Sequence, residues 1–183
     1  MLKAMEHFEK TISSQRIHEG RIINLREDTV ALPSGRSAKR EIVEHQGAVC
    51  VVPVLNDGRI VMVRQFRKPA EDALLEIPAG GLNPNEDPMD CARRELIEEC
   101  GLHGGELTPL FTSYLAPGYS TEKIYGYLAL GLREETAQAD EDEFVEVVPL
   151  SLDAALAAIA TGDIEDAKTI AGLTLAARLL PTL

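Results

Sequence analysis

The stretch GLNPNEDPMDCARRELIEECGL, residues 81–102, contains the clearest helix signals in this chain. Asp87 is suited to cap a helix, Pro88 fits the first helical position, and Gly101 provides a stop. Apolar side chains recur along one face of the segment, as they do when that face packs against a core. The spacing therefore predicts a helix over residues 88–100 with one buried face.

Three glutamates share one sector of this predicted helix. At about 100° per residue, Glu99 lies about 40° from Glu95 on one side and Glu98 about 60° on the other. They border the apolar stripe and do not lie opposite it. Because like charges one turn apart repel one another, the cluster is either a solvated face, partly paired through Arg94 and Glu98, or a site for something positive.

The surroundings of the cluster favour a cation site. The helix follows LLEIPAGGL, residues 74–82, which predicts a short strand that enters a glycine-rich loop. In such a loop the backbone can approach a ligand closely. Clustered carboxylates offer oxygen ligands, which suit Mg²⁺ and Mn²⁺, and these ions are commonly shared with substrate phosphates.

Composition and charge limit the class of protein. The chain has 183 residues, 45% hydrophobic and 26% charged, which suits one globular domain with a small appendage. Its formal net charge of −12 argues against binding to nucleic acid or to an anionic membrane. No apolar run reaches membrane-spanning length, and MLKAMEHFEKTISSQ lacks the apolar core of a signal peptide. The three cysteines have no zinc-site spacing, which indicates reduced thiols in a cytoplasmic protein.

The remaining sequence predicts a mixed sheet with few helices, an α/β fold. Residues 12–44 predict strands and turns, and the apolar run AVCVVPVL, residues 48–55, predicts a strand buried on both faces. The turn NDG, residues 56–58, predicts a hairpin that leads to a partner strand over residues 59–66. Further strands and then two helices are predicted over residues 107–115, 123–132, 144–150, 151–162 and 166–180.

The same stretch, begun one residue earlier at Gly80, resembles the signature of the Nudix hydrolases. That signature is G-x5-E-x7-R-E-U-x-E-E-x-G-U, where U is a bulky apolar residue. Gly80 and Glu86 fill the first two fixed positions, RELIEECGL fills the others, and every specified position matches. The resemblance implies a Nudix α/β/α sandwich with a mixed β-sheet over residues 46–183, preceded by an N-terminal β-rich segment, residues 1–45.

Nudix hydrolases cleave a nucleoside diphosphate linked to another moiety, with water attacking a phosphorus atom of the diphosphate. The resemblance implies that Glu95 and Glu99 are the main metal ligands, that Glu98 assists, and that the Ala79 carbonyl joins them. Arg94 would orient the glutamates. Mg²⁺ or Mn²⁺ would neutralise the diphosphate, which reconciles the acidic chain with an anionic substrate.

Segments outside the signature resemble the ADP-ribose pyrophosphatases within this family. Pro117 lies sixteen positions beyond Gly101, in the loop APGYSTE, where these enzymes have a proline. The resemblance implies that Pro117, Gly118 and Glu122 bind substrate, with Glu122 at the terminal ribose. An ordinary Pro-Gly turn is the alternative.

Two arginines in similar segments are further candidates for substrate binding. Arg40, in REIVEH, and Arg67, in VRQFR, are implied contacts to phosphate or ribose. Each could equally be a surface charge on a strand. The resemblance places the catalytic base outside the signature, in ADEDEFVE, residues 139–146, with Glu141 as the first candidate and Glu143 as the second. A solvated acidic loop is the alternative there.

The expected activity is hydrolysis of ADP-ribose to AMP and ribose 5-phosphate. Hydrolysis of other nucleoside diphosphate sugars, such as ADP-sugars or GDP-mannose, is the alternative. A sensor that binds without cleaving is a further class, but such proteins tend to lose the signature glutamates, which are all present here. The resemblance also implies a homodimer in which the N-terminal β segment crosses to the partner and helps bind adenine.

Overall fold

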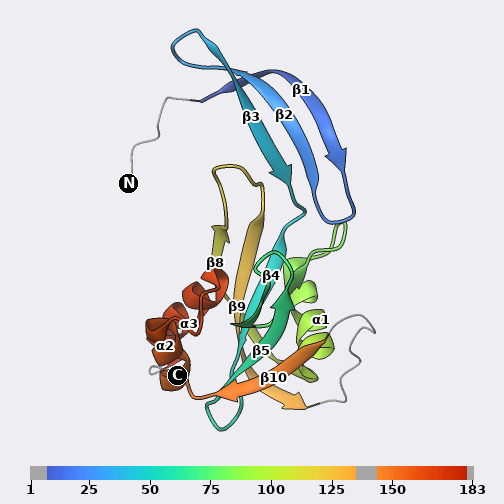
Figure 1. Ribbon diagram of the computed structural model, residues 1–183. Helices are drawn as coiled ribbons and strands as arrows, with labels where there is room; N and C mark the ends of the chain where they lie inside the picture. Colours follow the sequence, from blue (N-terminus) through green and yellow to red (C-terminus); the bar gives the residue numbers. More distant parts are fainter. Residues whose placement is uncertain (1–7, 135–143, 181–183) are drawn as a thin grey trace. The chain divides into compact units, whose positions relative to one another are not determined.

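The computed structural model describes residues 8–134 and 144–180, and contacts divide the chain into two compact units (Figure 1). Unit 1 consists of the described residues through Gln46 together with the segment Tyr114–Lys123. Unit 2 consists of Gly47–Ser113 and the described residues from Ile124 onward. The whole signature stretch therefore lies in unit 2.

Unit 1 is a three-stranded antiparallel sheet. Its strands, in the order β1-β2-β3, are Lys10–Glu19, Asn24–Ala31 and Ser37–Glu44. The segment from residue 114 to residue 123 joins this sheet through backbone hydrogen bonds, in which the Val43 N–H donates to Tyr119 and the Thr121 N–H donates to Val43. The strands predicted within residues 12–44 are thus present.

Unit 2 contains two sheets and three helices. One sheet has the order β7-β4-β9-β8, with strands Ala79–Gly81, Ala48–Pro53, Lys123–Glu134 and Leu102–Tyr114. The other has the order β10-β5-β6, with strands Val145–Leu150, Ile60–Arg67 and Asp72–Glu76. Because β4 pairs parallel with β9 and antiparallel with β7, the first sheet is mixed, as expected.

The predicted hairpin between the first two strands of unit 2 is wrong in its pairing. The turn forms, with the Leu55 N–H donating to Arg59 at 2.8 Å, but only one bridge, Val54 to Ile60, joins the strands. The edges of β4 are taken by β7 and β9, and a strand has only two edges. The β5 strand therefore pairs with β6 and β10 in the second sheet.

The segment LLEIPAGGL contains the end of a strand, as predicted, but part of the expected glycine-rich loop forms a second short strand. β6 ends at Glu76 and β7 begins at Ala79, and the two belong to different sheets. Pro78 lies between them, and proline has no N–H to continue a ladder. This break puts the backbone of β7 beside the helix that carries the glutamates, because α1 contacts β7 directly.

The three helices lie where the sequence predicts them. α1 spans Pro88–Cys100, with the Asp87 carboxylate accepting from the Met89 N–H at 2.8 Å and Gly101 in the left-handed region at φ 61°. Glycine pays no steric penalty in that conformation. α2 and α3, which span Leu152–Thr161 and Ala167–Leu179, start from side-chain caps at Ser151 and Asp166.

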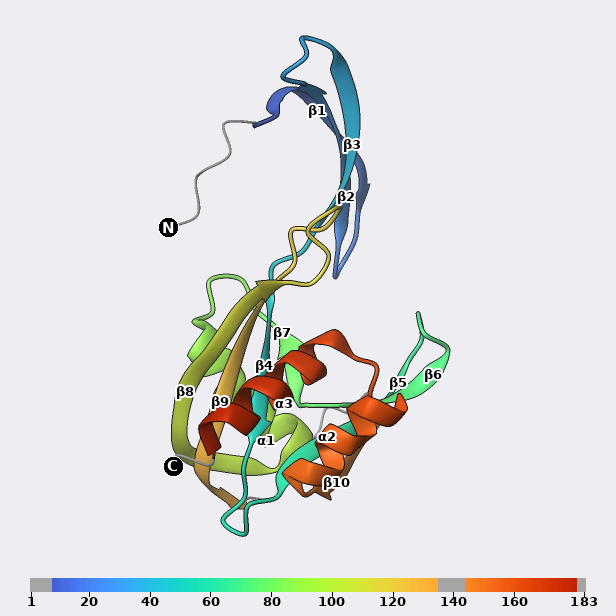
Figure 2. The same cartoon turned by 90° about the vertical axis from the view of Figure 1, so that its left-hand side faces the viewer.

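Alternating side chains of β4 place the core on both faces of its sheet. Val49 and Val51 pack in a cluster with Leu96 of α1, whereas Val52 packs in a second cluster with Leu173 of α3. Figure 2 shows α2 and α3 together along the sheet. The helix, sheet and helix layers make the α/β/α sandwich that the resemblance to Nudix hydrolases implies. Within residues 8–134 and 144–180, no helix combines the length and apolar character needed to cross a membrane.

Candidate functional site

Arg94 of α1 lies among three carboxylates of the signature. Its Nε and Nη2 donate to Glu86 at 3.0 and 3.1 Å, and its Nη1 donates to Glu95 at 2.7 Å and to Glu98 at 2.8 Å. The ion pair between Arg94 and Glu98 that the spacing suggested is therefore present. The hydrogen bond from Arg94, followed by one from the Asn83 N–H, lowers the pKa of Glu86 to about 2.

Two of the three clustered glutamates are buried. Glu95 and Glu99 are each 7% exposed, while the side chain of Glu98 is 32% exposed. The Ala79 N–H donates to Glu99 Oε2 at 3.0 Å, which ties that carboxylate to the first residue of β7. Buried carboxylates need compensating partners, and the chain supplies Arg94 to one and a backbone amide to the other.

Gly80 allows Glu95 to occupy its place beside β7. A Cβ atom at position 80 would lie 1.9 Å from Glu95 Oε1, far inside contact distance. The neighbouring Gly81 has nothing within 4 Å of the same imaginary atom. The glycine at the first signature position therefore provides space for a carboxylate and does not serve a turn.

The charge and donor type of this cluster fit a divalent cation. Glu86, Glu95, Glu98 and Glu99 contribute −4 and Arg94 contributes +1, which leaves a formal charge of −3. All four acidic groups offer oxygen, the ligand that Mg²⁺ and Mn²⁺ prefer. Among the described residues, no group of three or more acidic, His or Cys side chains already has the arrangement of a metal site. Instead, Arg94 lies between the carboxylates.

Arg67 belongs to the same unit as the glutamate cluster. Its Nε and Nη2 donate to Glu76 at 2.9 and 2.7 Å, so Glu76 holds one edge of the Arg67 guanidinium. The hydrogen bond that Arg67 donates to Glu76 raises the pKa of Arg67, and the charge of Glu99 adds to this effect. Glu76 is 2% exposed and also accepts from Lys168. Sequence reasoning missed both partners, although a charged residue that ends an apolar strand is a signal for Glu76.

Arg40 lies in unit 1 and pairs with Glu9. Its Nε donates to Glu9 at 2.9 Å and its Nη2 forms the second contact, which together raise the pKa of Arg40. In the same unit, Pro117 and Gly118 lie in a turn that the Ala116 carbonyl closes by accepting from the backbone N–H groups of residues 119 and 120. The turn geometry expected of a Pro-Gly pair is therefore present.

The predicted site residues are divided between the two units. Ala79, Arg67 and the three glutamates of α1 lie in unit 2, whereas the others with described positions lie in unit 1, namely Arg40, Pro117, Gly118 and Glu122. Glu141 and Glu143 lie outside the described residues. The structure therefore brings the metal-site candidates and Arg67 into one unit.

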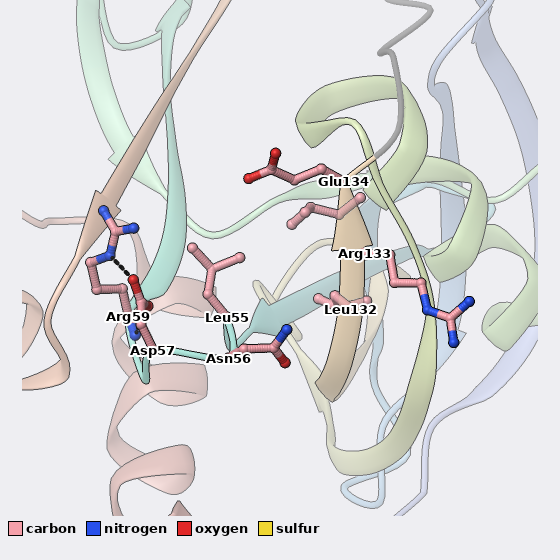
Figure 3. A pocket seen from close by; sticks show the side chains of 8 residues that line it. Leu55, Asn56, Asp57, Arg59, Leu132, Arg133 and Glu134 are labelled. Atoms are coloured by element: carbon pink, nitrogen blue, oxygen red, sulfur yellow. Dashed lines mark hydrogen bonds and ion pairs between the residues drawn. The ribbon is translucent and has the colours of Figure 1, made fainter.

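A pocket of about 400 Å³ lies elsewhere in unit 2. Figure 3 shows the side chains of Leu55, Leu132 and Glu134 around it, and the ion pair in which Arg59 Nε meets Asp57 at 2.7 Å. None of the predicted metal- or substrate-binding residues lines this pocket. We therefore assign the pocket no part in the candidate site.

Two family models match the chain one after the other. The NUDIX domain matches residues 44–173, and the nucleoside diphosphate sugar hydrolase N-terminal domain matches residues 9–43. A solved structure described as an ADP compounds hydrolase has a TM-score of 0.85 and 22% identity, covering 99% of this chain and 98% of that one. At that identity, the likeness concerns the fold.

Curated relatives are similar over most of the chain. An ADP-ribose pyrophosphatase from Bacillus subtilis (strain 168) is 45% identical over 170 residues, which cover 92% of this chain and 91% of that protein. A methanol dehydrogenase activator from Bacillus methanolicus is 46% identical, covering 88% and 89%. A GDP-mannose pyrophosphatase from Citrobacter koseri is 38% identical, covering 72% and 74%. With its signature complete and its hydrolase domain matched over 44–173, this chain belongs to the Nudix family of hydrolases.

Proposed function

We propose that this Nudix hydrolase cleaves the diphosphate of ADP-ribose with the help of divalent metal ions. Water adds its oxygen to one phosphorus atom, and the bond from that atom to the bridging oxygen breaks. The bridging oxygen leaves with the other phosphate, so the products are AMP and ribose 5-phosphate. The observation that carries this proposal is the carboxylate surplus of the cluster formed by Glu86, Glu95, Glu98, Glu99 and Arg94, with its formal charge of −3. A relative that is 45% identical bears the name of this activity.

The metal ligands that we propose are the Ala79 carbonyl and the side chains of Glu95, Glu98 and Glu99. Mg²⁺ is the proposed ion, with Mn²⁺ as a second oxygen-preferring choice. When bound, such an ion neutralises diphosphate charge and lowers the pKa of a ligated water. The chain itself holds the carboxylates in place, through Arg94 on one side and through the Ala79 N–H on the other.

Arg67 is the proposed phosphate contact within unit 2. Glu76 holds its guanidinium by one edge, while its side chain remains 37% exposed. A guanidinium has five N–H donors and binds phosphate in a forked geometry. We further propose that Arg40, Pro117, Gly118 and Glu122 contribute to substrate binding, as the resemblance to ADP-ribose pyrophosphatases implies.

Glu141 is the proposed catalytic base, with Glu143 and then Glu98 as the next candidates. Glu141 and Glu143 precede β10 in the sequence. The first residue of β10, Val145, pairs with Gln65. Gln65 lies only two residues before Arg67 on β5. β10 therefore begins beside the end of β5 that carries the proposed phosphate contact, and this start of β10 supports a base in the residues that precede it in sequence.

The proposed domain roles are a hydrolase domain, residues 46–183, and an N-terminal segment, residues 1–45, for dimerisation and substrate binding. All ten residues of β1 are exposed, and Ile12 and Ile17 expose 61% and 52% of their surface. A second copy of the chain would cover such side chains in a homodimer. A monomer in light scattering with full activity would contradict this assembly. The three free thiols support the proposed cytoplasmic location.

A substrate panel tests the proposed activity. The purified chain is incubated with Mg²⁺ and equal concentrations of ADP-ribose, an ADP-hexose and GDP-mannose, and the products are separated. We expect AMP and ribose 5-phosphate from ADP-ribose at the highest kcat/KM, and no product in excess EDTA. Faster turnover of another sugar nucleotide would favour the second candidate, a broader nucleoside diphosphate sugar pyrophosphatase. That candidate is supported by the similarity to GDP-mannose pyrophosphatase.

A further inference from the structure

A buried ion network joins the ends of β5 and β6 to the first turn of α3, all within unit 2. The Glu76 carboxylate accepts from Arg67 at 2.9 and 2.7 Å, and it also accepts from Lys168 Nζ. Lys168 in turn donates at 2.9 Å to Asp166, the residue that caps α3. Two cations thus balance two carboxylates, so the network is neutral as a whole.

The members of this network differ in their exposure to solvent. The side chains of Glu76 and Lys168 are 2% and 9% exposed, whereas that of Arg67 is 37% exposed. A buried carboxylate is costly without partners, and a pair that loses one partner is strongly destabilised. Glu76 and Lys168 are therefore held in the interior, and the Arg67 side chain extends from them towards solvent. Glu76 occupies one edge of its fork and leaves the other donors to an anion.

Burial and hydrogen bonding act in opposite directions on Glu76. Burial is the largest single cause and raises its pKa, but the hydrogen bonds from Arg67 and the charge of Lys168 together lower the pKa below its usual value. The carboxylate therefore stays ionised at neutral pH. An ionised Glu76 is what a bidentate hold on a guanidinium requires.

The same turn of α3 also fixes the backbone that leads to the metal-site candidates. Thr169 Oγ1 accepts from the Ile77 N–H at 2.9 Å, and Thr169 is fully buried. The Pro78 carbonyl accepts from the Val51 N–H at 2.9 Å, and the Ala79 N–H donates to Glu99. The N–H groups of Ile77 and Ala79 are therefore both hydrogen bonded, and Pro78 has no N–H to satisfy. The start of α3 thus holds Arg67 through Glu76 and holds the loop at the Ile77 N–H.

We propose that Lys168 is a positioning residue: it holds Glu76, which in turn aims the guanidinium of Arg67 at a phosphate of the substrate. This inference rests on the proposed function, because it takes Arg67 as a phosphate contact. Lys168 does not touch substrate in this scheme and acts only through the other two residues. Its effect is therefore on substrate affinity, since a contact made equally in the ground state and the transition state changes KM and not kcat.

A double-mutant cycle tests this arrangement with the full-length protein. Lys168→Met, Arg67→Lys and the double variant are compared with the native chain in steady-state hydrolysis of ADP-ribose with Mg²⁺. We expect Lys168→Met to raise KM about tenfold, the size of one charge-assisted hydrogen bond, with kcat changed less than about twofold. In the Arg67→Lys background, Lys168→Met should leave KM almost unchanged, because the guanidinium that Lys168 helps to position is absent.

Two controls separate positioning from a general loss of structure. Lys168→Arg keeps a cation and should restore most of the KM, whereas Arg59→Met removes an exposed ion pair with Asp57 and should leave both constants unchanged. If Lys168→Met does not fold, Glu76→Gln replaces it in the cycle, since this substitution keeps the shape but breaks the bidentate contact. Additive effects on KM, or a fall in kcat alone, would overturn the inference.

The wild-type reaction separates this inference from the proposed function. If the native chain prefers another nucleoside diphosphate sugar, the proposed substrate is wrong and the cycle is measured with that sugar. If the chain binds ADP-ribose without cleaving it, the proposed activity is wrong and the cycle is measured on Kd. If it neither binds nor cleaves any nucleoside diphosphate sugar, both proposals are overturned.

Discussion

Glu95 Oε1 lies only 1.9 Å from the position that a Cβ atom on residue 80 would occupy. The two residues come from different elements, α1 and β7, and the absence of one methyl group lets the carboxylate reach its place. Glu95 Oε1 is at the far end of a flexible side chain. A larger residue at position 80 would therefore displace the Glu95 carboxylate and leave the backbone in place.

Gly80→Ala should therefore reduce activity much more than stability. We expect kcat/KM to fall roughly 100-fold, because a displacement of about 1 Å in a catalytic group has effects of that order. Gly81→Ala is the matched control, since that Cβ atom would meet nothing within 4 Å. Kinetics with Mg²⁺ and thermal unfolding measure the two effects. A large fall in Tm for Gly80→Ala would contradict this account.

Glu99→Gln should strongly reduce metal-dependent turnover in a protein that still folds. The amide can still accept from the Ala79 N–H through its oxygen, but it loses the charge that attracts a divalent ion. We expect a loss of roughly 100- to 1,000-fold in kcat, the scale for removal of one group that stabilises the transition state electrostatically. Glu106→Gln, on an exposed position of β8, is the control. Turnover within twofold of the native rate would refute the metal assignment.

The ion pair between Glu86 and Arg94 should make stability depend on pH in the acid range. The pKa of Glu86 is about 2 in the folded chain, below its usual value of 4.5. The unfolded chain therefore binds more protons between these values, and the pair's contribution is complete above pH 4.5. As the pH falls from 4.5 towards 2, that contribution is lost. Thermal unfolding of Glu86→Gln against pH should show a smaller acid-range slope than the native chain.

Thr169→Val should destabilise the fold because it removes a hydroxyl that makes two hydrogen bonds, one accepted from the Ile77 N–H and one donated to Asp166. The substitution keeps the shape of the side chain but leaves the buried Ile77 N–H without the hydroxyl that accepts from it at 2.9 Å. We expect a loss of about 1–3 kcal/mol in the free energy of unfolding by urea. Thr161→Val removes an exposed hydroxyl and should cost less than about 0.5 kcal/mol. Equal losses of unfolding free energy in Thr169→Val and Thr161→Val would contradict a stabilising role of the Thr169 hydroxyl.

Local signals account for the parts of the fold that the sequence predicted correctly. The cap at Asp87 and the stop at Gly101 act within one turn of α1, and the helix has the predicted bounds. The buried strand after Gly47 was equally clear from its apolar run. Both features depend on neighbours in the sequence, so a single chain contains enough information to predict them.

Long-range pairing accounts for what the sequence did not predict. The choice of β5 to pair with β10 and not with β4 is settled by strands far along the chain. Glu76 and Lys168 are 92 residues apart, and no local pattern links them. The division of the predicted site residues between two units also depends on tertiary contacts. The identities of the site residues could be proposed from the signature, but the residues that hold them could not.

Arg94 offsets part of the repulsion within the carboxylate cluster. A cluster of four carboxylates would resist folding if only external ions could neutralise it, but here one guanidinium already binds three of them. The chain therefore carries an internal counterion at the place where ions are proposed to bind. One of the four negative charges is therefore offset within the chain itself, and a bound ion would meet the remaining formal charge of −3.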